Sequence, residues 1–109
     1  MRSERVFTVL HRNEAGAVAM CDQCDHVHIE IENVITVLSP AALEDILIEL
    51  SHRKMNLDDY TVKTLIGPRI VIRLTDAVFL SLTKINCIRL IELFEISSHM
   101  LAVKTLITR

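Results

Sequence analysis

The sequence predicts an α+β domain in which an antiparallel sheet, built from two strand-strand-helix repeats and an N-terminal hairpin, packs against two main helices. Short segments that alternate apolar and polar residues predict half-buried strands, and turn residues separate them. Twice, a pair of such segments leads through a serine or threonine into a longer segment with helical apolar spacing. The repeats span residues 27–55 and 70–107, and the hairpin spans residues 6–21. Because 109 residues supply one ordinary core, we expect a single domain over residues 1–109.

The N-terminal hairpin is predicted from two apolar runs, residues 6–10 and 17–20. They flank residues 13–16, whose asparagine and glycine are typical of a turn. A further strand is expected over residues 60–66, ended by the Gly-Pro dipeptide that follows it.

Repeat one begins with two strands, residues 27–31 and 34–38, joined by a turn at residues 32–33. Ser39 is suited to cap a helix, and Pro40 is favoured at the first helical position. The apolar residues that follow recur at the spacing of one buried helical stripe, which consists of Leu43, Ile46, Leu47 and Leu50.

Repeat two has the same order. Residues 70–74 alternate, residues 75–77 form a turn one residue longer than the first, and residues 78–82 run back. Thr83 then caps a long helix. The agreement of turn, cap and apolar stripe favours a duplicated unit over coincidence.

The second helix, residues 83–107, carries apolar residues on more than one side: Ile85, Ile88, Leu90, Ile91, Leu93, Phe94 and Ile96. A domain of this size has little interior to surround such a helix, so we expect a partner chain to cover its far side. The resulting hypothesis is a homodimer through this helix, because two-fold association is the commonest closed assembly. The alternative is that the sheet wraps the helix from both sides.

One segment, residues 21–28, carries side chains suited to metal or thiol chemistry. Two cysteines three residues apart in a tight turn can aim both sulfurs at one point, and thiolate is a strong zinc ligand. Strand alternation places His26 near these thiols, and a histidine lies on the neighbouring predicted strand. The predicted tetrahedral zinc site consists of Cys21, Cys24, His26 and His11. Other routes to four ligands use His28, or two such turns that face each other across a dimer axis.

Two other interpretations of this segment stay open. Cys21 and Cys24 can be ordinary reduced thiols, with the histidines on a solvated strand face. They can also form a redox pair, which is the weakest interpretation because such pairs normally start a helix whose N-terminus lowers the thiol pKa, whereas this pair leads into a strand.

In these elements the chain resembles a family of short uncharacterised bacterial proteins. The resemblance consists of a glycine-containing hairpin, the Cys21 to Cys24 pair, a strand, a turn at Asn33, a second strand and a helix capped at Ser39. It covers the first half of the chain well and the second half only as a pattern. The family has no established activity, so the resemblance implies an architecture and no function, and it assigns no role to His26 or His28.

Composition excludes several classes of protein. The net charge is −2 with both signs spread along the chain, so no basic field exists to attract nucleic acid or an anionic membrane. Aromatic residues make up only 4% of the chain, too few for a base-stacking platform. Residues 85–107 carry too many charges for a membrane span, and the N-terminus lacks the apolar run of a secretory signal. We therefore expect a cytoplasmic protein.

Two functional hypotheses follow. The first is a non-catalytic binding or regulatory domain, homodimeric, whose partner is another protein and whose thiol turn can hold a structural zinc. The second is a small metal-dependent or thiol-redox enzyme that uses residues 21–28. Enzyme signatures are otherwise missing: the two glycines are isolated, and no Gly-x-Ser-x-Gly or His-Glu-x-x-His motif is present.

Overall fold

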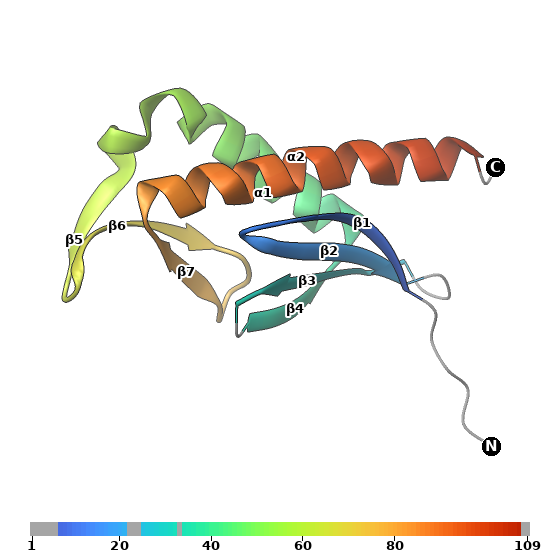
Figure 1. Cartoon of the computed structure of the whole chain (residues 1–109), viewed down its shortest axis with the longest axis horizontal. Coiled ribbons are helices and arrows are strands. Elements are labelled where there is room, and N and C mark those ends of the chain that lie inside the picture. Colours follow the sequence, from blue (N-terminus) through green and yellow to red (C-terminus); the bar gives the residue numbers. More distant parts are fainter. Residues whose placement is uncertain (1–6, 22–24, 33, 108–109) are drawn as a thin grey trace, which may run out of the picture.

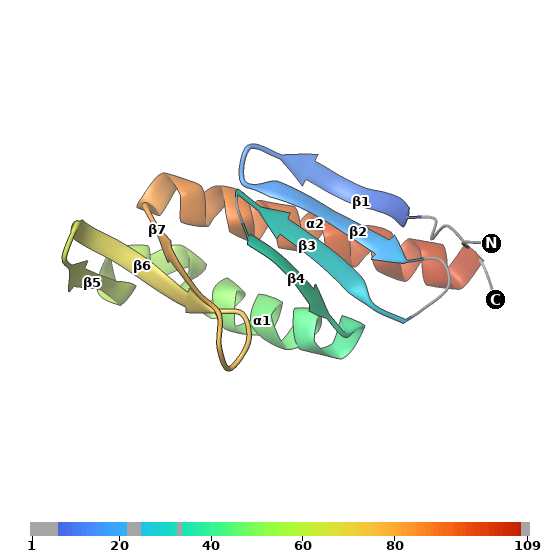
Figure 2. The ribbon, with the colours of Figure 1, turned by 90° about the horizontal axis from the view of Figure 1, so that it is seen from below.

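The computed structural model describes residues 7–21, 25–32 and 34–107. Two helices lie on one side of a layer formed by two antiparallel sheets, as Figures 1 and 2 show. The predicted α+β class is confirmed. The shape is elongated, with principal extents of 49 × 31 × 24 Å.

The first four strands form one sheet in the order β1-β2-β3-β4. The strands are β1 (Phe7–Asn13), β2 (Gly16–Cys21), β3 (Val27–Ile31) and β4 (Val34–Leu38). Both predicted hairpins of this half are confirmed. The β1-β2 register shifts between Val9 and His11, which marks a β-bulge at Leu10.

The remaining strands form a separate three-stranded sheet in the order β5-β6-β7. They are β5 (Thr61–Thr64), β6 (Gly67–Arg73) and β7 (Phe79–Leu82). The expectation of one sheet is therefore wrong in this detail. Helix α1 (Pro40–Arg53) and the 3-10 helix η1 (Lys54–Tyr60) carry the chain away from β4 to the other end of the molecule, where the later hairpins form their own sheet.

The strand expected over residues 60–66 exists as β5, but it ends at Thr64. Gly67 and Pro68 do not end it, because they are the first residues of β6. The turn between the two strands consists of Leu65 and Ile66, which lack the residue types that usually mark a two-residue turn.

Both predicted helix caps are confirmed. The Ser39 hydroxyl accepts a hydrogen bond from the backbone N–H of Ala42 (3.1 Å) at the start of α1. The Thr83 hydroxyl accepts one from the N–H of Asn86 (3.3 Å) in α2 (Lys84–Ile107). The strand-strand-helix order thus occurs twice, as β3-β4-α1 and β6-β7-α2. A common origin of these two units stays a prediction.

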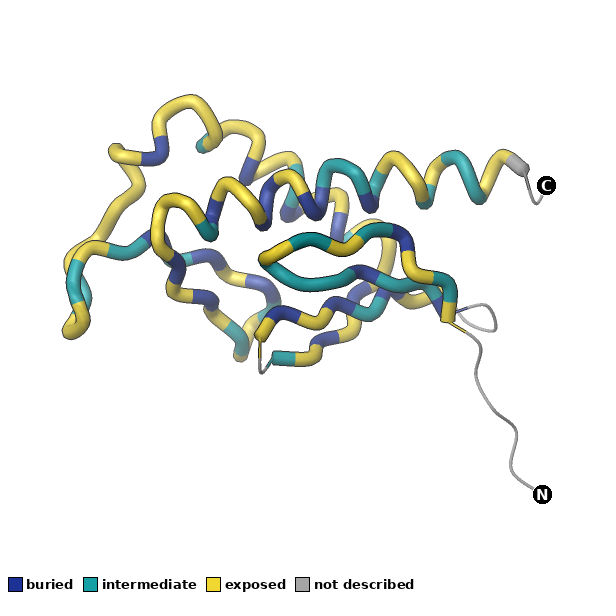
Figure 3. The backbone as a smooth tube through the Cα atoms, viewed as in Figure 1, coloured by how far each residue is buried: buried dark blue, intermediate teal, exposed yellow. Residues whose placement is uncertain are grey.

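Helix α2 lies at the centre of the fold. It contacts β1 and β2 on one side and α1 on another, and its first turns contact β6 and β7. The residues buried in it include Leu90, Ile91, Leu93 and Phe94. Figure 3 shows buried positions on the sides of the helices and sheets that face one another. One continuous apolar core therefore joins both sheets through this helix.

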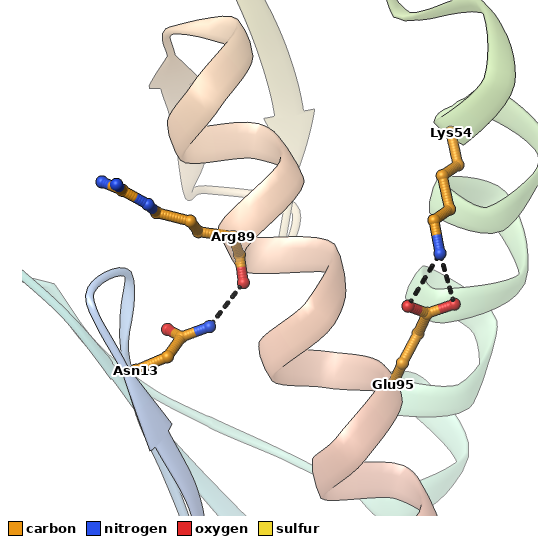
Figure 4. Close-up of polar contacts among 4 residues, drawn as sticks. All are labelled: Asn13, Lys54, Arg89 and Glu95. Atoms are coloured by element: carbon orange, nitrogen blue, oxygen red, sulfur yellow. Dashed lines mark hydrogen bonds and ion pairs between the residues drawn. The ribbon is translucent and has the colours of Figure 1, made fainter.

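Polar contacts fix α2 against its neighbours at the surface (Figure 4). The side-chain amide of Asn13, at the tip of the β1-β2 hairpin, donates to the backbone carbonyl of Arg89 (2.8 Å). Lys54, the first residue of η1, forms an ion pair with Glu95 (3.2 Å). Because this ion pair is solvent-exposed, it contributes at most about 1 kcal/mol, and it sets orientation more than stability.

Gly16 begins β2 at a point where the chain has no room for a side chain. Its φ is +154°, and a Cβ atom built on it would lie 2.1 Å from the backbone oxygen of Glu30 in β3. Gly67 also has a positive φ of +114°, but a Cβ there would meet nothing within 4 Å. Substitutions at these two glycines therefore distinguish the cost of backbone strain from the cost of steric overlap between strands.

We expect Gly16→Ala to lower the free energy of unfolding by about 4 kcal/mol, because the cost of the positive φ adds to the cost of steric overlap with the backbone of Glu30. The matched control Gly67→Ala should cost about 1–2 kcal/mol from strain alone. Urea unfolding monitored by circular dichroism measures both. Equal losses in the two variants would contradict the close approach of β2 and β3.

Candidate binding surfaces and the predicted thiol site

The structure places only part of the predicted zinc site. Cys24 lies outside the described residues. Cys21 ends β2 and is fully buried, and its backbone N–H donates to the carbonyl oxygen of His26 (3.3 Å). The His26 side chain is exposed. Cys21 and His26 therefore flank the same connection between β2 and β3.

The structure does not bring His11 to this connection. His11 pairs with Val18, whose side chain faces the core, whereas Cys21 pairs with Phe7. Because Cys21 follows Val18 by three residues, their side chains lie on opposite faces of the sheet. The bulge at Leu10 causes this, because it turns His11 away from the face that Phe7 occupies. In the described ranges, no group of three or more His, Cys, Asp or Glu side chains is arranged to hold a metal ion.

His28 has a packing role in the structure. Its ring stands edge-on to the ring of Phe7, with 4.6 Å between the ring centroids. Such T-shaped pairs are favourable because the ring edge of one partner meets the face of the other. Zinc binding by Cys21, Cys24 and His26 stays a prediction, and His28 has an explanation without a metal.

Cys87, in α2, is also fully buried. Burial raises the pKa of its thiol above the ordinary value of 9.0, and the positive charge of Arg53 offsets part of the rise. A thiol with a raised pKa and no exposure is a poor nucleophile. Cys87 is thus a core residue, as its place among Leu90 and Ile91 indicates.

The four-stranded sheet has two faces of different character, set by its register. The inner face packs against the core. We call the other the outer face; paired residues place on it Phe7, Val9, Arg12, Ala17, Ala19, Cys21, His28, Glu30, Ile35 and Val37. Only Arg12, His28 and Glu30 of these are polar or charged. Phe7, Val9, Ile35 and Val37 are exposed, Ile35 by 71%.

An open face of an antiparallel sheet normally carries polar residues, so that apolar and polar side chains alternate along each strand. Strand β4, Val-Ile-Thr-Val-Leu, departs from this rule because its outward residues are Ile35 and Val37. The sequence carried this signal in the missing polar alternation of residues 34–38. A β-branched run by itself predicts a strand and does not indicate which of its residues face outward, so the outer face is not predicted from the sequence.

The apolar sides of α2 are mostly covered by the chain itself. The alternative expectation, in which the sheet wraps the helix from both sides, does not describe the structure either: β1 and β2 cover one side of α2 and α1 covers another. In the middle of the helix this buries Leu90, Ile91, Leu93 and Phe94. Ile85 and Ile88 remain exposed at its start. The reason for expecting a partner on the far side of the middle of α2 is therefore lost.

A groove opens beside the last turns of α2. It has a volume of about 560 Å³ and lies between α2, the start of α1 and residues 25–27. Its lining is mainly apolar and includes Met20, Val27 and Leu101, with the carboxylates of Asp25 and Glu44 among its polar groups. This volume is within the range of small-molecule sites.

Comparison with known proteins adds no relative: no family model, no curated protein and no solved structure matches the chain. The resemblance to the bacterial family of the first section thus stays a prediction. Within the part of the chain that the structure describes, neither helix combines the length and apolarity needed to cross a bilayer.

The placement of His11 gives a test of the metal site. We expect His11→Ala to leave the metal content of the protein unchanged, because His11 lies across the sheet from Cys21. Inductively coupled plasma mass spectrometry on protein purified without a metal-affinity tag measures this. Cys24→Ser is the comparison, since it removes a thiolate that any zinc in this turn requires. Loss of stoichiometric zinc in His11→Ala would restore the predicted set of four ligands.

The raised pKa of Cys87 predicts a pH dependence of stability. The folded protein keeps the thiol proton at pH values at which the unfolded chain has released it, so stability falls as the pH rises above 9.0. The slope is at most about 1.4 kcal/mol per pH unit. Cys87→Ala is less stable at neutral pH because it leaves a small cavity, but it lacks this slope. The difference in free energy of unfolding between the wild type and Cys87→Ala should narrow between pH ~8 and ~10.5 in urea unfolding. A constant difference contradicts a raised pKa of Cys87.

Proposed function

We propose that this chain is a non-catalytic binding domain that self-associates as a symmetric dimer through the outer face of its four-stranded sheet. The observation that carries the proposal is the apolar character of that face, where Phe7, Val9, Ile35 and Val37 are all exposed. Extended apolar patches on a soluble protein mark interaction surfaces. The proposal keeps the homodimer predicted from sequence and moves its interface from α2 to the sheet.

A second copy is a suitable occupant because the outer face complements itself. Arg12 and Glu30 belong to one cross-strand row, in which each pairs with Ala17 of β2. A two-fold axis over this row would set Arg12 of one copy opposite Glu30 of the other, in both directions. The neighbouring outward row, which contains Val9, Ala19 and Val37, would then pack as two sheets do in a β-sandwich, about 10 Å apart.

The outward side chains of the face differ in size from strand to strand, which affects how closely two copies can pack. Small residues, Ala17 and Ala19, occupy β2, one of the two inner strands, while larger side chains stand on the other three strands. The two-fold axis that sets Arg12 opposite Glu30 passes over β2, so Ala17 and Ala19 of one copy would lie against the same residues of the other. Their small side chains would let the two sheets approach closely at the centre of the interface.

Catalysis by residues 21–28 is the weaker hypothesis. Cys21 is buried, and in the described residues no carboxylate or histidine lies with it in a group able to hold a metal. A structural zinc at this turn is compatible with the proposed dimer, since it would act on stability and need no open coordination position.

The interface is tested by Ile35→Lys, which places a charge at the most exposed apolar position of the face. Ile48→Lys on α1 is the matched control, because Ile48 is also exposed (51%) but lies on the helical side. Light scattering after size-exclusion chromatography at micromolar concentration should show a dimer for the wild type and the control. Ile35→Lys should weaken association at least tenfold, by about 1.4 kcal/mol or more. A monomeric wild type, or dimers in all three proteins, contradicts the proposal.

A further inference from the structure

The groove beside the end of α2 is a second surface, separate from the outer face. We propose that it binds a small apolar molecule that carries a positive charge. The inference rests on three features of the groove: an uncovered helical stripe, an apolar floor and two carboxylates.

The stripe comes from α2, which continues past the start of α1 (Figure 1). Ser98, Leu101, Ala102 and Thr105 line the groove at helical spacings of three and four, so they share one side of α2. The other side of these turns meets the sheet, where the Lys104 ammonium donates to the hydroxyl of Thr8 (3.2 Å). The stripe is thus held in place from behind while its front remains open to a ligand.

The opposite wall and floor are supplied by other elements. Met20 and Val27, a paired set from β2 and β3, contribute apolar surface, and Pro40 contributes the first turn of α1. Together with α2, four elements therefore converge on one groove of about 560 Å³. Ligand sites are typically concave, mainly apolar and supplied with a few placed polar groups.

The polar groups select the charge of the ligand. The titratable side chains among the described lining residues are Asp25, Glu44 and His26, and none of these lining residues is lysine or arginine. Ser98 donates a hydrogen bond to Glu44 (2.8 Å), which joins α2 to α1 and holds the carboxylate in place without neutralising it. A positioned carboxylate beside apolar surface attracts a cationic group that an apolar molecule carries.

The N-terminus of α1 has the opposite electrostatic effect on a ligand, so its partial charge is compared with the charges of the two carboxylates. A helix N-terminus acts as about half a positive charge and can bind anions through its free N–H groups. Here Pro40 has no N–H, and the N–H of Ala42 already donates to Ser39. Two full carboxylate charges therefore outweigh the helix terminus, and a cation is favoured over an anion.

Three amphiphiles that share the same octyl chain and differ in the charge of their head group test the proposal. They are n-octyltrimethylammonium, n-octyl sulfate and n-octyl glucoside, each below its micellar concentration. Two-dimensional amide NMR titrations give both the affinity and the residues affected. We expect the cation to bind most tightly, with shifts confined to the groove around Leu101 and Val27. Tighter binding of the sulfate, equal binding of all three, or shifts spread over the protein would overturn the proposal.

Two variants isolate the charge. Glu44→Gln keeps a hydrogen-bond acceptor for Ser98 but removes the carboxylate, and it should weaken cation binding roughly fivefold, the equivalent of about 1 kcal/mol, while the glucoside is unaffected. Glu49→Gln is the control on the same helix, because Glu49 pairs with Arg53 and does not line the groove. Equal effects of the two variants would overturn the assignment of Glu44.

Ala102→Trp tests the position, because it fills the groove from an exposed site on α2 and should abolish binding of all three amphiphiles. Ile35→Lys should bind the cation as the wild type does, so failure of the proposed dimer and failure of the groove are distinguishable. If a second copy occupies the groove instead, the affinity for the cation would fall as the protein concentration rises, and the proposal would be wrong.

Discussion

The fold depends on the burial of one helix whose apolar residues point in several directions. Helix α2 presents Leu90, Ile91, Leu93 and Phe94 to different neighbours, and no single sheet can cover them all. The chain meets this constraint by surrounding α2 with β1 and β2, with α1, and with the three-stranded sheet at its start. The two sheets therefore share a core through the helix although no strand joins them. Truncation of a core residue of α2 should therefore remove packing contacts from both sheets at once.

Local features of this fold could be predicted from sequence because short-range chemistry determines them. The hairpins, the caps at Ser39 and Thr83 and the length of α2 depend on residues close together in the chain. The division into two sheets could not be predicted, because strand pairing is settled by which edges meet after the helices pack. The turn at Leu65 and Ile66 was missed because two aliphatic residues give no turn signal.

In the predicted metal site, one extra residue in β1 changes which side chains lie on the same face of the sheet. Regular alternation along β1 would place Phe7, Val9 and His11 on one face, the face that also includes Cys21. The bulge at Leu10 adds one residue and sends His11 to the inner face. A bulge has no composition signal of its own, so sequence spacing alone could not reveal it. The position of Cys21 at the end of β2, next to the connection that leads to His26, was predictable from the strand boundaries.

The outer face and the groove lie on different sides of the molecule because different elements leave apolar side chains uncovered at each of them. In the sheet, β1 and β4 carry apolar side chains at outward positions, whereas the helices can cover only the inner face. Helix α2 is longer than the elements that support it, so its last turns leave a stripe open beyond the contact between Ser98 and Glu44 of α1. Occupation of one surface leaves the other accessible. A dimer formed through the sheets would accordingly present two grooves, one on each copy, and both would face away from the two-fold axis.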